Sequence, residues 1–432
     1  MYASKPKPQI PNPEFPSPGI IASLKEAPVR KMLTNGRFVL VLVVLTAAGL
    51  LVARELAGQN RNGTQAPFFE VDPLWPKPLP NHWVLGSTIG VSVDERDHVW
   101  IIHRGSATLG NNEKGLELKP PTGECCAAAP PVLEFDAEGN LVGHWGGPGE
   151  GYEWPASNHG ITIDHKGNVW IGGNGDQDSQ VLKFTRDGKF LLQVGKSGAR
   201  KGPNNEKGQA TFVGGSNDQV SFGRVAKIFI DPAANEAYLA DGYLNKRVAI
   251  IDADSGKLKR YWGAYGNKPD DTPLGPYKPE APPAQQFRNP VHCADLSKDG
   301  LVYVCDRQNN RLQVFTKEGK FVKEAFYAKN SLSEGAVWDV AFSKDAAQTY
   351  VFLADGRNMK IRVLRRDTLE ELTSFGDGGR QPGQFYAVHS IATDSKGNLY
   401  TTETYEGKRV QKFSYKGLKS VAKREQGTVW PR

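Results

Sequence analysis

Residues 289–315 read NPVHCADLSKDGLVYVCDRQNNRLQVF, and they set the pattern for most of the chain. Three short runs rich in Val and Leu alternate apolar with polar residues, and turns that carry Gly, Asp and Asn separate them. A fourth run follows at 320–325 after a second turn. The stretch therefore predicts four antiparallel strands, which cannot bury both faces of their sheet unless similar units lie beside it.

The same pattern occurs six times. Aligned on the first turn of each copy, the matching positions lie 46 to 70 residues apart and are Asp94, Asp164, Asp231, Ser297, Ser343 and Asp394. Six such sheets arranged radially predict an all-β, six-bladed β-propeller over 66–432, which leaves only short, protected strand edges. We expect the segment at 68–80 to add an outer strand to the last blade. An open array of β-sandwiches is the alternative.

Three of the eight histidines fall in register at the start of the first strand of a copy. Five residues before each turn anchor, the six copies carry in order Ile89, His159, Ala226, His292, Trp338 and His389. The first strand of every propeller blade lines the central channel, and alternate blades are related by a threefold rotation. The register therefore predicts three imidazoles that converge as a three-His site for a divalent transition metal. The alternative is three unrelated polar residues at the rim of a wet channel.

Residues that end the second strands are expected beside these histidines, because a hairpin returns the end of its second strand to the start of its first. This set contains Arg104, Tyr243, Arg307, Arg357 and Tyr405. Arginine binds carboxylates as a fork, and a phenol beside a divalent cation and an arginine has a lowered pKa that suits a general base. We interpret Arg104, Tyr243 and Arg307 as functional, and Arg357 and Tyr405 as candidate pocket residues.

The first 65 residues do not fit the repeat. Residues 1–37 are basic and rich in Pro, 38–53 form a 16-residue apolar run, and 54–65 are a linker. The apolar run predicts either a signal-peptide core or a transmembrane anchor. The basic residues ahead of it predict that the propeller is exported to a periplasmic, extracellular or lumenal compartment, membrane-bound if the anchor is not cleaved.

Charge and cysteine content narrow the expected partners. The formal net charge is +7, of which residues 1–57 carry +4, so the body is close to neutral and we expect no nucleic-acid partner. Four cysteines suit an exported chain with one or two disulfides. Cys293 and Cys305 lie near one another across one hairpin and are interpreted as structural. The pairing of the four, including the adjacent Cys125 and Cys126, stays open.

The motifs around these positions resemble those of peptidyl-α-hydroxyglycine α-amidating lyase, a six-bladed propeller of NHL-type repeats. The resemblance covers about 90–417. Its motifs are HRG at 103–105, HGITID at 159–164, DGYLNKR at 241–247, VHCADL with DRQNNRLQVF at 291–315, and VHSIATD at 388–394. It implies a catalytic zinc on His159, His292 and His389, with Tyr243 as the base and the arginines of the HRG and DRQ motifs beside it.

The resemblance also implies a structural calcium, held partly by the backbone carbonyls of Val91 and Ile161. The carboxylate ligand of that calcium follows the last motif histidine, where this chain has Ser390. The implied reaction is a metal-dependent cleavage of the C–N bond of an N-acyl-α-hydroxyglycine, a small molecule or a peptide, to an amide and glyoxylate. Two alternatives stay open: a different metal-dependent propeller hydrolase such as a lactonase, and a non-catalytic NHL scaffold that binds a protein or an envelope ligand.

Overall fold

The computed structural model describes residues 63–421 and 424–431, which belong to a compact unit that begins at Gly63. The apolar run at 38–53 lies outside the described residues. Within them the chain folds into 26 strands and four short 3-10 helices, with no α-helix. No helix in this part of the chain is long and apolar enough to span a membrane.

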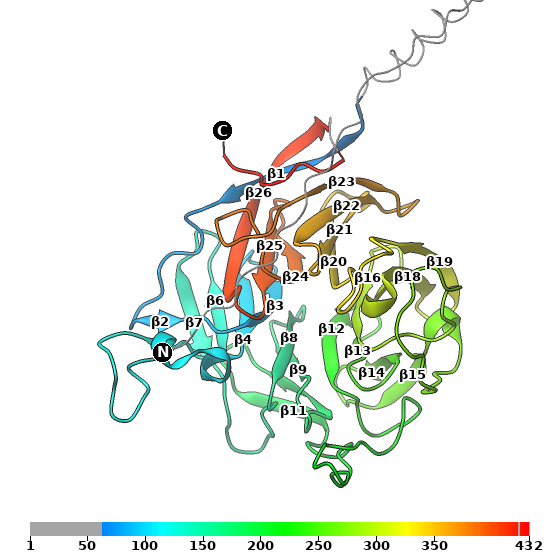
Figure 1. Cartoon of the computed structure of the whole chain (residues 1–432), viewed down its shortest axis with the longest axis horizontal. Helices are drawn as coiled ribbons and strands as arrows, with labels where there is room; N and C mark the ends of the chain where they lie inside the picture. Colours follow the sequence, from blue (N-terminus) through cyan, green and yellow to red (C-terminus); the bar gives the residue numbers. More distant parts are fainter. Residues whose placement is uncertain (1–62, 422–423, 432) are drawn as a thin grey trace, which may run out of the picture. The chain divides into compact units, whose positions relative to one another are not determined.

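Six four-stranded antiparallel sheets form the blades of a propeller, as predicted (Figure 1). The first three blades are β3 (Thr88–Val93), β4 (Val99–His103), β6 (Val132–Phe135) and β7 (Leu141–Trp145); β8 (Asn158–Ile163), β9 (Val169–Gly173), β10 (Gln180–Phe184) and β11 (Phe190–Gly195); β12 (Val225–Asp231), β13 (Glu236–Asp241), β14 (Arg247–Asp252) and β15 (Leu258–Trp262). The last three are β16 (Val291–Leu296), β17 (Leu301–Asp306), β18 (Arg311–Thr316) and β19 (Phe321–Phe326); β20 (Asp339–Phe342), β21 (Tyr350–Asp355), β22 (Lys360–Arg365) and β23 (Glu371–Phe375); β24 (Val388–Thr393), β25 (Leu399–Glu403), β26 (Arg409–Ser420) and β1 (Gln65–Asp72).

The remaining elements lie in the connections between strands. Strands β2 (Trp83–Val84) and β5 (Ala127–Ala128) form a short parallel pair that joins the segment before blade one to the insertion within it. The 3-10 helices are η1 (Gly105–Thr108), η2 (Asn111–Glu113), η3 (Ala264–Gly266) and η4 (Arg307–Asn309). The first strands of neighbouring blades contact one another all round the ring, so these strands line its centre.

Blade four shows why the alternating pattern produces a propeller. Its first three strands lie at the positions that the stretch 289–315 predicts, and its fourth is β19. Successive side chains of β17 face opposite ways. Val302 and Val304 pack in a core shared with blade three, whereas Tyr303 and Cys305 pack in a core shared with blade five. Each of the six hydrophobic clusters lies between two adjacent blades, so no blade buries its faces alone.

The two ends of the propeller meet in the last blade. Strand β1 pairs antiparallel with β26 and supplies the outermost strand of the sheet that β24 and β25 begin. The sequence predicted such a strand from residue 68, and the structure places it slightly earlier, at Gln65–Asp72. Because an early segment completes the last sheet, the ring is held closed by ladder hydrogen bonds and hides the edge of β26.

Candidate active site and metal centre

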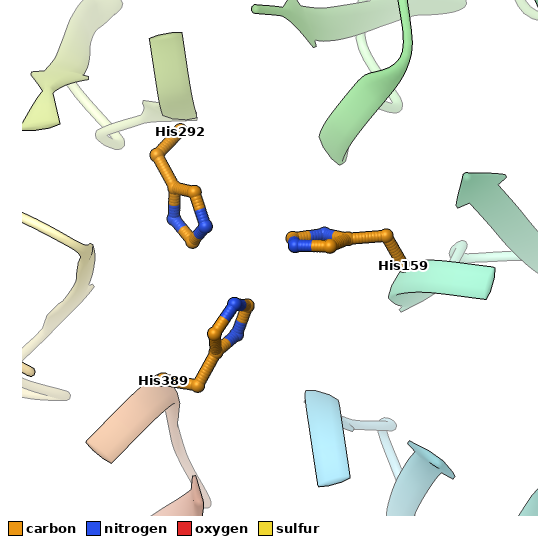
Figure 2. Close-up of side chains that lie close together, drawn as sticks. All are labelled: His159, His292 and His389. Atoms are coloured by element: carbon orange, nitrogen blue, oxygen red, sulfur yellow. The ribbon is translucent and has the colours of Figure 1, made fainter. Parts of the chain in front are cut away.

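The structure brings the three predicted histidines together on the propeller axis (Figure 2). His159 comes from β8, His292 from β16 and His389 from β24, on alternate blades. One ring nitrogen of each lies within 4.8 Å of those of the other two, and the ring centroids are 4.7 to 5.2 Å apart. All three side chains are buried.

A β-bulge at the start of the first strand helps to turn these side chains inward. The pairing of β16 with β17 skips His292, and that of β24 with β25 skips His389. In β8 the register shifts directly after His159. A bulge bends its strand and re-aims the side chain at that point. The repeat therefore supplies the position of each histidine, and the bulge supplies its direction.

Backbone carbonyls on the intervening blades hold two of the rings. Nδ1 of His159 lies 2.6 Å from the carbonyl oxygen of Ala226, and Nδ1 of His292 lies 2.6 Å from that of Trp338. A carbonyl oxygen only accepts, so each Nδ1 carries the proton and each Nε2 keeps its lone pair. Ala226 and Trp338 occupy the same repeat position as the histidines, so the odd blades orient the ligands of the even ones.

The third ring is held through a hydroxyl group. Nδ1 of His389 lies 3.3 Å from Oγ of Ser390, and that hydroxyl donates to the carbonyl oxygen of Ile89 at 3.1 Å. Ile89 is the equivalent position on blade one. The other two histidines bond such a carbonyl directly, whereas His389 reaches it through the hydroxyl group of Ser390. Since the hydroxyl proton goes to Ile89, Ser390 accepts from the ring and selects the same tautomer.

The three imidazoles are neutral. Burial holds the pKa of each well below its ordinary value, and nearby positive charge lowers it further: Arg104 acts on His159, and Arg307 acts on His292. For His389 the other two rings add to the effect of burial. Neutral imidazoles with fixed, inward lone pairs are the donor set that a divalent transition metal prefers, so these residues fit such an ion.

Tyr243 lies against the histidines, in the loop that follows β13 of blade three. Its phenol oxygen is 2.9 Å from Nε2 of His159 and 3.1 Å from Nε2 of His292. The loop reaches this point because Gly242 sits against β16, where a Cβ atom would lie 2.0 Å from the carbonyl oxygen of Val291. Only glycine permits that approach, and it carries the tyrosine to the axis.

Arg307 reaches the same phenol from blade four. Its NH1 donates to the oxygen of Tyr243 at 3.3 Å, and its guanidinium lies 4.6 Å from the ring centre of Trp338. NH2 of Arg307 pairs with Glu334, and the arginine is 4 % exposed. Glu334 lies in the connection before β20 and matches no position of the repeat, so the sequence pattern contained no signal for it.

Arg104 and Tyr405 complete the surroundings of the phenol. NH2 of Arg104 donates to Oδ1 of Asn174 at 2.9 Å, and burial lowers the pKa of this arginine, whereas Tyr243 and Tyr405 raise it through their charge. Tyr405 is 46 % exposed, and its carbonyl oxygen accepts from the hydroxyl of Ser87 on blade one. Tyr405 therefore lies at the rim of the site, where blades six and one meet.

The structure places Arg357 apart from this group. Its side chain is exposed and lines a surface hollow of about 410 Å³ with Lys329 and Asn358. It takes part in none of the contacts that join the histidines, Tyr243 and Arg307. Position at the end of a second strand predicted proximity, but the turn after β21 directs this residue outward.

The next layer of the channel holds a lysine. Nζ of Lys227 lies 3.0 Å from Asp295 and 2.6 Å from Asp339, and all three side chains are largely buried. Although burial lowers the pKa of Lys227, the charges of the two carboxylates raise it above its usual value. Burial raises the pKa of Asp295, against the charge of Lys227, which lowers it.

This layer does not fit the calcium that the resemblance implied. Val91 and Ile161 line a cavity of about 570 Å³ together with Lys227 and Asp295. Calcium needs several oxygen ligands, including carboxylates, and here both buried carboxylates are already paired with an ammonium group. Ser390, at the place of the expected carboxylate ligand, bonds His389 and Ile89 instead.

The structure pairs the four cysteines as two disulfides. Cys293 is bonded to Cys305 across the first two strands of blade four, next to a metal-site histidine but facing the core between blades. Cys125 is bonded to Cys126 in the blade-one insertion, which leaves no free cysteine among the described residues. The sulfur of Cys293 is therefore not a metal ligand.

Comparison with known proteins places this site in context. No family model matches the chain. It is 32 % identical to peptidyl-glycine alpha-amidating monooxygenase B of Xenopus laevis over 262 aligned residues. These residues make up 59 % of the chain and 26 % of that protein. It is also 24 % identical to NHL repeat-containing protein 3 of Mus musculus over 386 aligned residues, which make up 84 % of the chain and 89 % of that protein. The chain is a distant homologue of both.

The match spans only about a quarter of the length of the amidating monooxygenases, so it concerns one part of those proteins. Among solved structures, a streptogramin B lyase aligns with a TM-score of 0.47 and 12 % identity, over 81 % of this chain and 98 % of that one.

Proposed function

We propose that this protein is an exported, metal-dependent carbon–nitrogen lyase that cleaves N-acyl-α-hydroxyglycine substrates to an amide and glyoxylate. One observation carries the proposal. Three inward-facing, neutral histidines converge on the axis, and the phenol of Tyr243 lies 2.9 and 3.1 Å from two of their nitrogens. The distant homology to amidating monooxygenases supports the same chemistry. The metal is zinc or another divalent transition metal, bound by His159, His292 and His389.

Tyr243 is placed to take the proton from the hydroxyl group of the substrate. A bound divalent metal would lower the pKa of that hydroxyl group. The guanidinium of Arg307 donates to the phenol oxygen at 3.3 Å and orients the proposed base. As the C–N bond breaks, its electron pair goes to nitrogen, which takes up one proton. That is the proton lost by the hydroxyl group, so the reaction balances without a co-reactant.

The two arginines have different surroundings, which suggest different roles. NH2 of Arg307 pairs with Glu334, and its NH1 donates to Tyr243. Within residues 63–421 and 424–431, Arg104 donates to two neutral oxygens alone, Oδ1 of Asn174 and the carbonyl oxygen of Asn158. An arginine without a carboxylate partner beside a metal site suits the carboxylate of the α-hydroxyglycine. We therefore assign Arg104 to substrate binding and Arg307 to the base.

Export is proposed from the apolar run at 38–53 and from the disulfides. Two disulfides within one chain suit an oxidising compartment. The proposed partner is a small-molecule or peptide substrate.

The test measures metal content and glyoxylate release on the purified chain. We expect about one metal ion per chain, and glyoxylate from α-hydroxyhippurate. His292→Ala should lose both while the β-sheet signal in circular dichroism persists. His165→Ala removes an exposed histidine of blade two and should keep both. A wild-type chain that binds no stoichiometric metal and releases no glyoxylate would refute the lyase proposal and leave the scaffold alternative.

A further inference from the structure

A second cavity, of about 450 Å³, borders the loop that carries Tyr243. We call it the basic pocket, because Arg200, Lys246 and Arg288 line it against one carboxylate, that of Asp271. Arg200 and Lys246 are 3 % and 8 % exposed. Buried cations normally pair with carboxylates, so these two, with the half-buried Arg288 beside them, need an explanation.

None of the three cations forms an ion pair within 4.0 Å in the described residues. Arg200 donates to the carbonyl oxygen of Val213 at 2.5 Å and to Oδ1 of Asn245 at 2.8 Å. Lys246 donates to the carbonyl oxygen of Thr272 at 3.0 Å and to Oε1 of Gln286 at 3.5 Å. The side chain of Arg288 donates to Oδ1 of Asn309 and to the carbonyl oxygen of Gly275. Every one of these acceptors is neutral.

Four arginines of the blades show the usual pairing. At the start of the third strand of four blades, an arginine pairs with the carboxylate that ends the second strand, at 2.6 to 2.7 Å: Arg247 with Asp241, Arg311 with Asp306, Arg362 with Asp355 and Arg409 with Glu403. The cations of the basic pocket differ from these four, because their hydrogen bonds go to neutral acceptors.

Carboxylates act on the cations of the basic pocket from a distance, without an ion pair to any of the three in the described residues. Burial lowers the pKa of Lys246, whereas the charges of Asp271, Asp270 and Asp306 raise it and that of Arg288 lowers it. Burial likewise lowers the pKa of Arg200, and the charges of Asp241, Asp218 and Asp271 raise it. One oxygen of Asp271 accepts from the backbone nitrogen of Ser216 at 2.7 Å, so that carboxylate is partly engaged. An anion in the cavity would give these cations a direct charged partner and relieve the repulsion between Lys246 and Arg288.

The basic pocket and the candidate active site share two stretches of backbone. Leu244 lines the pocket and directly follows Tyr243, and Gln308 lines it and directly follows Arg307. Asn289, also in the lining, donates to the carbonyl oxygens of Gly242 and Asn245 at 2.8 and 2.9 Å and holds this loop in place. Leu244, Phe212, Pro273 and Leu274 make part of the wall apolar.

We propose that the basic pocket binds the acyl end of the substrate, and that this acyl group has an apolar stem that ends in a carboxylate. The inference rests on the proposed function, since it takes the α-hydroxyglycine end of the same molecule to lie at Tyr243. The apolar wall contacts the stem, and Arg200, Lys246 and Arg288 bind the terminal carboxylate. The basic pocket thereby selects the substrate without taking part in bond cleavage.

The test compares two substrates that differ by one carboxylate: α-hydroxyhippurate and its para-carboxy derivative. For the full chain we expect kcat/KM at least about tenfold higher for the para-carboxy compound, as a charge-assisted bond to buried cations implies. Lys246→Met should bring the ratio of the two kcat/KM values close to one, and Arg288→Met should lower it. Lys268→Met, which removes an exposed lysine and the same charge, should leave the ratio as in the wild type.

Binding of the amide products tests the basic pocket separately from the reaction. In calorimetric titrations of the full chain, 4-carboxybenzamide should bind at least about tenfold more tightly than benzamide, and Lys246→Met should remove the difference. If neither substrate releases glyoxylate, the lyase proposal fails and this titration alone decides about the pocket. Equal affinities for the two amides, or a preference that survives in Lys246→Met, would overturn the inference.

Discussion

Replacement of Lys227 by methionine tests the charged layer beneath the histidines. The ammonium lies 3.0 and 2.6 Å from Asp295 and Asp339, whose side chains are 10 % and 1 % exposed. Removing one partner of a buried ion pair leaves uncompensated charge and costs about 3–5 kcal/mol. The compact unit has about 370 residues, and its entropy of unfolding is about 0.8 kcal/mol per kelvin. The melting temperature should therefore fall by about 4–6 °C.

The loss should depend on pH. Without Lys227, the two buried carboxylates have folded-state pKa values above those of the unfolded chain, so the folded state binds more protons. A group of this kind destabilises the fold at high pH, and the penalty shrinks as pH falls through its folded pKa. Differential scanning calorimetry at pH 8 and pH 5.5 should therefore show a larger loss for Lys227→Met at pH 8.

Two controls separate the lost ion pair from loss of a lysine as such. Lys344→Met removes a lysine that lines the same cavity and forms no ion pair within the described part of the chain, so its melting temperature should stay near that of the wild type. Adding Asp295→Asn and Asp339→Asn to Lys227→Met removes the stranded charges and should recover most of the loss. The reasoning is refuted if Lys227→Met melts like the wild type at pH 8, or loses the same amount at both pH values.

Two further predictions concern the base and the outer face of the sheets. Tyr243→Phe should lower glyoxylate release by about a hundredfold or more while metal content stays at one per chain; activity near the wild-type level would exclude the phenol as base. Hydrogen bonds from Arg260, followed by those from Lys259, hold the pKa of Glu236 at about 2 against an ordinary 4.5. Its contribution, about 1–2 kcal/mol after solvent screening, is full above pH 4.5 and lost towards pH 2. Glu236→Gln should therefore lower the melting temperature at pH 7 and not near pH 2.5; an equal effect at both would contradict this.

Much of the site could be predicted from the sequence, because each copy of the repeat is a continuous stretch of chain. Position within a copy is enough to align His159, His292 and His389, and the motif around Tyr243 marks a turn at the end of a second strand. The same reasoning misplaced Arg357, because position at a strand end does not determine where the following turn directs a side chain. Sequence reasoning missed Glu334, because this residue lies in the connection between β19 and β20, outside the strands on which the copies are aligned.

The sequence pattern alone determined the strands, the number of blades and the placement of the histidines on alternate blades. It did so through alternating apolar residues and turns that contain Gly, Asp and Asn, because strands and turns depend on residues that are neighbours in sequence. Closure of the ring decided the rest. The carbonyls that orient the imidazoles, the ammonium between Asp295 and Asp339, and the cations of the basic pocket come from segments up to 301 residues apart. Such groups meet only when the blades pack round one axis, and their distances depend on that packing, which the pattern within one copy does not determine.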